Sequence, residues 1–159
     1  MIQEFLSLSQ SKFDELLNAP EMIFSWIEGE PGPDQHMDID KAWQGIHFLL
    51  TGNPWSEEPP LGLVICGGIE FGEDVGYGPA RYVLPEEVKA ISESLAPLNE
   101  ETLSKRYDPA SMSAQQIYPE IWGQEDDDAL GYLLSYFLEV KRLYTEAALA
   151  GNAVVHYLT

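Results

Sequence analysis

The sequence predicts a single compact α+β domain, in which several helices pack on a small, mostly antiparallel sheet. Three observations lead to this prediction. Strand-like segments lie at both ends and in the middle of the chain, helical patterns gather between them, and the longest helical pattern directly precedes a final strand. One domain over residues 1–159 fits the chain length, and 45% hydrophobic residues are enough to fill a core.

The first quarter of the chain predicts one strand followed by short helices. Residues 2–9, IQEFLSLS, alternate in the manner of an edge strand. Ser9 or Ser11 can cap a first helix, which ends at Pro20, and EMIFSWIE adds one or two more helical turns. The turn-rich residues 29–35, GEPGPDQ, then interrupt the regular structure.

Residues 38–52, DIDKAWQGIHFLLTG, predict a core helix. The apolar residues recur at helical spacing, Gly52 follows as a stop signal, and Asp38 or Asp40 is placed to cap the helix start. The two aspartates also alternate with His36, which would suit half of a metal site. Capping explains them more simply, and no second histidine–carboxylate cluster has ligand spacing. The sequence therefore predicts neither a metal nor another cofactor.

The middle of the chain predicts two strands joined by a glycine-rich loop. Residues 61–68, LGLVICGG, form a short apolar run typical of a buried strand, and residues 80–84, ARYVL, predict the second strand. We expect residues 70–79, EFGEDVGYGP, to be a loop in which Gly76 and Gly78 allow backbone angles that other residues avoid.

The rest of the chain predicts four helices and a closing strand. Pro85, Asn99 and Asp108 mark the starts of the first three helices, as a first-turn proline or as N-caps. The fourth helix is the longest and runs from about residue 126 to residue 150, with acidic residues before it that complement its dipole. The closing residues 153–159, AVVHYLT, predict the final strand.

The charge balance restricts the partners. With 27 acidic and 8 basic residues, the net charge is −19, so the chain is repelled by nucleic-acid phosphates and by anionic membrane surfaces. A basic protein or a cation is the favoured partner, unless the acidity serves solubility alone. The one cysteine, Cys66, excludes an internal disulfide, and the N-terminal segment has no secretory signal pattern, so we expect a cytoplasmic protein.

The candidate ligand-binding residues are Lys41, Trp43, His47, Asp74, Tyr77 and Arg81. His47 lies on the apolar stripe of its helix, where it is either a buried core histidine or a functional base or ligand. Cys66 could act as a nucleophile with His47 as its base, or it is a small buried hydrophobe.

Residues 73–81, EDVGYGPAR, are the most individual part of the chain. One interpretation is a shaped loop that presents Tyr77 and Arg81 to a ligand. The other is a tight connection in which Arg81 neutralises Asp74 or the acids near residues 38–40.

Four segments carry a resemblance to a known family: DIDKAWQGIHFLLTG, GGIEFGEDVGYGPARYVLPEEVKAI, YDPASMSAQQIYPEIW and LGYLLSYFLEVKRLYTEAALAGNAVVHYLT. They span nearly the whole chain in order and resemble the YfbM-like family of bacterial proteins, domain of unknown function 1877. The resemblance implies a compact α+β cytoplasmic domain. It implies no reaction and no catalytic residues.

Two functional hypotheses follow from the sequence. The first is a protein-interaction module, inhibitor- or immunity-like, whose acidic surface docks on a basic protein, since no catalytic constellation is complete. Under this hypothesis, neutralising EDDD, residues 125–128, slows association. The alternative is a small enzyme or small-ligand-binding domain with a cleft between the 38–52 helix and the 73–81 loop. The sequence leaves the oligomeric state open.

Overall fold

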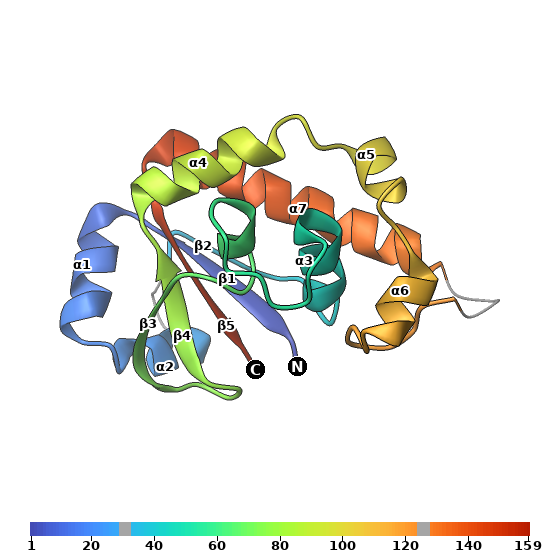
Figure 1. The fold of residues 1–159 in the computed structure, drawn as a ribbon. Helices are drawn as coiled ribbons and strands as arrows, with labels where there is room; N and C mark the ends of the chain where they lie inside the picture. The colour runs from blue at the N-terminus through green and yellow to red at the C-terminus, as the bar shows by residue number, and fades with distance from the viewer. Residues whose placement is uncertain (29–32, 124–127) are drawn as a thin grey trace.

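A five-stranded sheet forms the centre of the computed structural model, which describes residues 1–28, 33–123 and 128–159 (Figure 1). All neighbouring strands are antiparallel, in the order β2-β1-β5-β4-β3. The strands are β1 (Gln3–Leu8), β2 (Gln35–Asp38), β3 (Ile69–Asp74), β4 (Pro79–Val83) and β5 (Ala153–Leu158). The predicted α+β class and the final strand after the long helix are confirmed.

Helices cover both faces of this sheet (Figure 1). On one face α1 (Gln10–Asn18) and α2 (Met22–Ile27) pack on one core cluster, and on the other face α3 (Trp43–Thr51), α4 (Pro85–Leu95) and α7 (Ala129–Ala150) pack on the second. The short α5 (Glu100–Ser104) and α6 (Pro109–Ala114) connect α4 to α7, and η1 (Leu61–Leu63) is a 3-10 turn.

The first strand lies inside the sheet, so its prediction as an edge strand is wrong. β1 pairs with β2 on one side and with β5 on the other. Its alternate side chains fill both cores: Phe5 packs with the α3, α4 and α7 side, and Leu6 and Leu8 pack with the α1 and α2 side. The partner strands lie far along the chain, and a local alternation pattern carries no information about them.

Residues 61–68 form no strand, which corrects the prediction for LGLVICGG. They make η1 and the turn after it, and the strand begins only at Ile69 and continues to Asp74, through residues predicted to be a loop. An apolar run marks burial but does not distinguish a strand from a tight helical turn. Gly62 and Gly67 permit the tight coiling, because a Cβ at either position would meet its neighbours at 2.6 Å.

The start of α3 also differs from its prediction, because neither aspartate caps the helix. Asp38 belongs to β2, where sheet pairing with β1 holds it in an extended conformation. Asp40 has a positive φ of 46°, and its carboxylate accepts a hydrogen bond from the Tyr132 hydroxyl at 3.0 Å. The N-cap position is Ala42, without a side-chain cap, whereas the predicted stop at Gly52 is confirmed with a φ of 72°.

The predicted starts of α4, α5 and α6 are confirmed, whereas Ser9 occupies the N-cap position of α1 without a side-chain hydrogen bond. Pro85 opens α4, the Asn99 side chain accepts a hydrogen bond from the Thr102 amide, and the Asp108 side chain accepts one from the Ser111 amide. Residues 29–32 of the turn-rich break and residues 124–127, which include most of the EDDD run, lie outside the described residues. None of the described helices is long and apolar enough to cross a membrane.

Replacement of Gly45 by alanine should destabilise the fold, although the same change in an exposed helix stabilises it. A Cβ at Gly45 would lie 2.7 Å from Cδ2 of Leu133 and 2.8 Å from Cη2 of Trp122. The gain in helix propensity is about 1 kcal/mol, whereas overpacking of a core costs about 1–3 kcal/mol. We therefore expect a net loss of about 1 kcal/mol in urea unfolding of Gly45→Ala. An unchanged or higher urea midpoint would show that Leu133 and Trp122 can move aside without a loss of stability.

Candidate functional site

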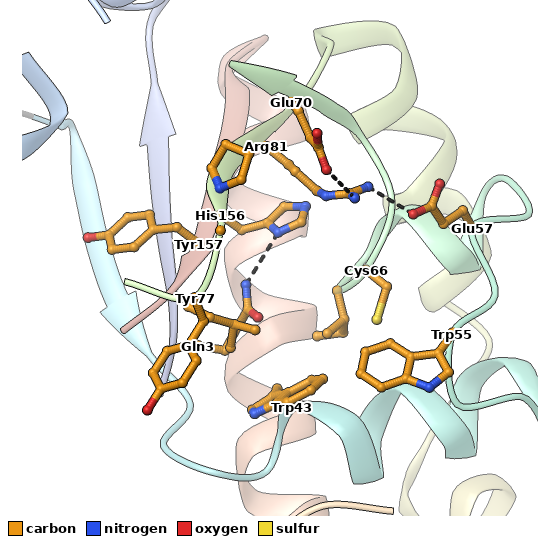
Figure 2. A pocket seen from close by; sticks show the side chains of 14 residues that line it. Gln3, Trp43, Trp55, Glu57, Cys66, Glu70, Tyr77, Arg81, His156 and Tyr157 are labelled. Carbon is orange, nitrogen blue, oxygen red and sulfur yellow. Dashed lines mark hydrogen bonds and ion pairs between the residues drawn. The ribbon is translucent and has the colours of Figure 1, made fainter. Parts of the chain in front are cut away.

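A pocket of about 220 Å³ opens at one end of the sheet (Figure 2). It lies between the start of α3, the loop that follows α3, the tip of the β3–β4 hairpin and the end of β5. The predicted cleft between the 38–52 helix and the 73–81 loop coincides with this pocket. Pockets for drug-sized ligands measure roughly 300–1,000 Å³, so this smaller pocket suits a smaller molecule or a single side chain.

One row of side chains across the sheet builds a wall of the pocket. The strand register places Phe5 opposite His156, His156 opposite Arg81, and Arg81 opposite Glu70. Directly opposed residues share a face of the sheet, so the four side chains lie on the side of α3. Burial decreases along the row, from the fully buried Phe5 to the exposed Glu70. The row therefore leads from the apolar core to the charged rim of the pocket.

Arg81 is the one cation among the residues that line the pocket, and two glutamates hold it (Figure 2). Its Nη1 donates to Oε1 of Glu57 at 2.9 Å, and its Nη2 donates to Oε1 of Glu70 at 2.7 Å. The expectation that Arg81 neutralises Asp74 or the acids near residues 38–40 is wrong. Its partners come from a loop and from the adjacent strand, a pairing that the sheet register creates.

His156 is a fixed and neutral part of the wall. The Gly67 carbonyl lies 2.9 Å from its Nε2 and can only accept, so Nε2 carries the proton and Nδ1 accepts from the Gln3 amide at 3.3 Å. The pKa of His156 is lowered to about 4, chiefly by burial; the Gly67 hydrogen bond opposes this shift and the nearby Arg81 adds to it. The imidazole is therefore neutral at pH 7 and ties β1 and β5 to residue 67.

Three aromatic side chains give the pocket its apolar surface. Trp43 is 2% exposed and packs against Trp55 with ring centroids 6.0 Å apart. Trp55 and Tyr77, by contrast, are 64% and 61% exposed. The buried Trp43 Nε1 has no hydrogen-bond partner among the residues that the structure describes. The pocket thus has a buried aromatic base and two exposed aromatic side chains at its mouth.

The loop that carries Trp55 and Glu57 is held by side-chain hydrogen bonds. The buried Gln44 donates to the Pro54 carbonyl at 3.4 Å and accepts from the Tyr118 amide at 2.8 Å, so it links the loop to a distant segment. The Trp55 amide donates to the Asn53 side chain at 2.8 Å. These contacts place Trp55 on a defined backbone beside Trp43.

The hairpin tip is shaped by Asp74 and fixed to the end of β5. One oxygen of Asp74 accepts from the amides of Gly76 at 2.7 Å and Gly78 at 3.2 Å. The Tyr77 amide donates to the Leu158 carbonyl at 3.2 Å. Asp74 therefore supports the turn that presents Tyr77, and it does not itself line the pocket.

Alanine at Gly76 should disturb this turn more than alanine at Gly78. Both glycines have positive φ, 153° and 107°, but only at Gly76 would a Cβ meet the backbone, 2.9 Å from the Leu158 carbonyl oxygen. Strain at φ costs about 1–3 kcal/mol in both variants, and the close approach adds to it only in Gly76→Ala. We expect the melting temperature of Gly76→Ala to be lower than that of Gly78→Ala. Equal melting temperatures would mean that the tip is not held against β5.

The structure brings together three of the six candidate residues. Trp43, Tyr77 and Arg81 line the pocket, whereas Lys41, His47 and Asp74 do not. Sequence reasoning missed Gln3, Trp55, Glu57, Glu70 and His156, which line it as well. A tryptophan in a proline-flanked loop, Trp55, was a usable signal in the sequence, but the strand residues become neighbours only through sheet register.

Cys66 and His47 form no nucleophile–base pair. Cys66 lines the pocket, where burial raises the pKa of its thiol to about 12, so the thiol stays protonated at neutral pH. His47 is completely buried, and neither of its ring nitrogens has a partner within the described part of the chain. Burial also lowers the pKa of His47 to about 4. Within residues 1–28, 33–123 and 128–159, no group of three potential metal ligands gathers.

A second hollow, of about 480 Å³, lies at the C-terminal end of α3. Its cation, Arg106, donates to the carbonyls of Leu49 at 3.1 Å and Leu50 at 3.4 Å, which are orphan acceptors of the last helical turn. Arg106 therefore has a structural role there, and the first pocket is the better candidate site.

The fold and the pocket together define an α+β domain with a small aromatic site at one end of its sheet. A family model described as "Domain of unknown function (DUF1877)" matches residues 1–157, and the chain belongs to this family. It is 26% identical to Protein YfbM of Escherichia coli (strain K12) over 132 residues, which are 79% of this chain and 77% of that protein.

The fold is shared with a solved structure of the same relative. The crystal structure of YfbM from Escherichia coli, a protein of unknown function, matches with a TM-score of 0.76 and 22% identity, over 98% of both chains. The YfbM-like resemblance seen in the sequence is thereby confirmed.

Proposed function

We propose that this chain is a binding domain for a small ligand, and that the ligand occupies the pocket beside Trp43. The observation that carries the proposal is the position of Trp55 and Tyr77. These two largely exposed aromatic side chains come from separate segments and line the same cavity (Figure 2). Single exposed apolar residues are ordinary, but aromatic residues that converge on one cavity are typical of binding sites.

The polar groups of the pocket support binding over catalysis. Both nitrogens of His156 are engaged, Arg81 is held by two carboxylates, and the Cys66 thiol is protonated at neutral pH. The neutral His156 and the protonated Cys66 thiol are not poised to take up or release a proton near pH 7.

The acidic surface supports a second candidate function, docking on a basic protein as an interaction module. The net charge of −19 would speed the encounter with such a partner and discourage anionic ones. The edge strand β3 contributes to this surface with the exposed Glu70, Glu73 and Asp74. A cytoplasmic location is part of the same proposal.

A thermal-shift panel of small cations, neutral molecules and anions tests the ligand-binding proposal. A ligand that binds the native state, present at about 100 times its Kd, stabilises it by about 2.7 kcal/mol and should raise the melting temperature by about 5–10 °C. Trp55→Ala and Tyr77→Ala should abolish the shift. Leu149→Ala is the control, since Leu149 is 85% exposed on α7 and does not line the pocket. Absence of any shift dependent on Trp55 would contradict the proposal.

A further inference from the structure

The charges that line the pocket favour a positively charged occupant. Glu57 and Glu70 face a single guanidinium, that of Arg81, and His156 is neutral, so the lining carries one net negative charge. The surrounding chain adds to this negative potential with its net charge of −19.

Arg81 is already neutralised and therefore offers little to an anionic ligand. Both of its ion pairs are short, at 2.9 Å to Glu57 and 2.7 Å to Glu70. An anion would have to displace a carboxylate from Arg81 and then lie beside that carboxylate. Each glutamate uses only Oε1 on Arg81, and the second oxygen of each makes no hydrogen bond to the described residues. The second carboxylate oxygens of Glu57 and Glu70 are thus available to accept hydrogen bonds from a ligand.

The aromatic side chains suit the same kind of ligand. The face of a tryptophan or tyrosine ring attracts a cation placed over it, most strongly for tryptophan. Trp43, Trp55 and Tyr77 provide three such rings around a cavity of about 220 Å³. The carboxylates carry full negative charges, and the faces of the aromatic rings carry partial negative charge. Both therefore attract a cationic ligand.

From these observations we propose that the pocket binds a small organic cation, an alkylammonium or guanidinium group. The inference rests on the proposed ligand-binding function and names its ligand class. Such a group occurs as a free metabolite and as the end of a lysine or arginine side chain. In the second case the pocket would hold one anchor residue of a basic partner.

The test compares ligands that differ in charge but not in shape. Calorimetric titration of the wild-type protein at low salt uses methylguanidinium, its neutral isostere N-methylurea, and acetate. We expect methylguanidinium to bind about tenfold more tightly than N-methylurea, from the cation–π and carboxylate interactions together. The preference should weaken as salt is added, because both glutamates are exposed.

Matched variants separate the pocket from the general charge of the protein. Glu57→Gln and Glu70→Gln should each weaken methylguanidinium binding several-fold, whereas Glu73→Gln removes the same charge from β3 without changing the lining and should leave it nearly unchanged. Equal losses in all three variants would overturn the assignment to the pocket.

The outcomes distinguish a failure of the cation proposal from a failure of the proposed ligand-binding function. Binding of N-methylurea or acetate as tight as that of methylguanidinium, lost in Trp55→Ala, would overturn the cation inference and leave a ligand pocket in place. No binding by any of the three would count against both. If methylguanidinium binds, the tripeptide glycyl-arginyl-glycine identifies the source: tighter binding of the peptide favours a protein side chain, and weaker binding favours a free cation.

Discussion

Acidification from pH 7 to pH 4 should lower the free energy of unfolding by roughly 6 kcal/mol through two buried histidines alone. The pKa of His47 and that of His156 are both lowered from 6.5 to about 4 by burial. Between these values the unfolded chain binds more protons than the native state. Stability is therefore complete above pH 6.5 and declines as the pH falls toward 4, by about 3 kcal/mol for each histidine.

The high negative charge opposes this effect and makes a variant necessary. Protonation of surface carboxylates relieves repulsion in a chain of net charge −19, which stabilises the native state on acidification. His47→Leu isolates the histidine contribution, because it removes a buried group without hydrogen-bond partners among the described residues. Urea unfolding at several pH values should show the variant gaining about 3 kcal/mol over wild type between pH 7 and pH 4. If the difference in free energy of unfolding between variant and wild type stayed constant over this pH range, the pKa of His47 would be the same in the folded and unfolded states.

Trp43→Ala and Trp55→Ala should differ strongly in their effect on stability. Trp43 is 2% exposed in the main core, so its truncation should cost about 3–5 kcal/mol. Trp55 is 64% exposed and packs against Trp43 with ring centroids 6.0 Å apart, so Trp55→Ala should cost about 1 kcal/mol or less. Ligand-induced thermal shifts should nevertheless disappear in Trp55→Ala.

Chemical unfolding of both variants, with ligand shifts measured on Trp55→Ala, checks this contrast. Trp55→Phe serves as a matched control, since it keeps an aromatic ring in the loop and should retain part of the binding. A loss of stability in Trp55→Ala as large as in Trp43→Ala would mean that Trp55 is a structural residue.

Local signals in the sequence were sufficient for the helices. Capping residues and the stop glycine depend on neighbours within one turn, so Asn99, Asp108 and Gly52 could be read correctly. Asp38 was misread because its pairing with Glu4 of β1 extends the backbone there. Asp40 was misread because it has a φ of 46° and its carboxylate accepts from Tyr132, a residue far along the chain. The apolar run before Ile69 was misread because burial alone does not specify conformation.

The site could be predicted only where its residues lie within distinctive local motifs. Trp43, Tyr77 and Arg81 belong to such motifs and do line the pocket. Gln3, Glu70 and His156 are unremarkable within their own strands and gain a role only because the register sets them side by side. His47 looked functional because its type is versatile, but its position on the apolar stripe leads to complete burial.

The most direct test of the binding pocket uses the indole N–H signals of the four tryptophans in a proton–nitrogen correlation spectrum. Trp43 and Trp55 line the pocket, whereas Trp26 packs on the α1 and α2 side and the Trp122 indole donates to the Ile117 carbonyl. Titration with methylguanidinium should move the Trp43 and Trp55 signals and leave those of Trp26 and Trp122 in place. If the Trp43 and Trp55 signals stay fixed up to saturating ligand, or if all four move alike, the pocket is not the site of binding.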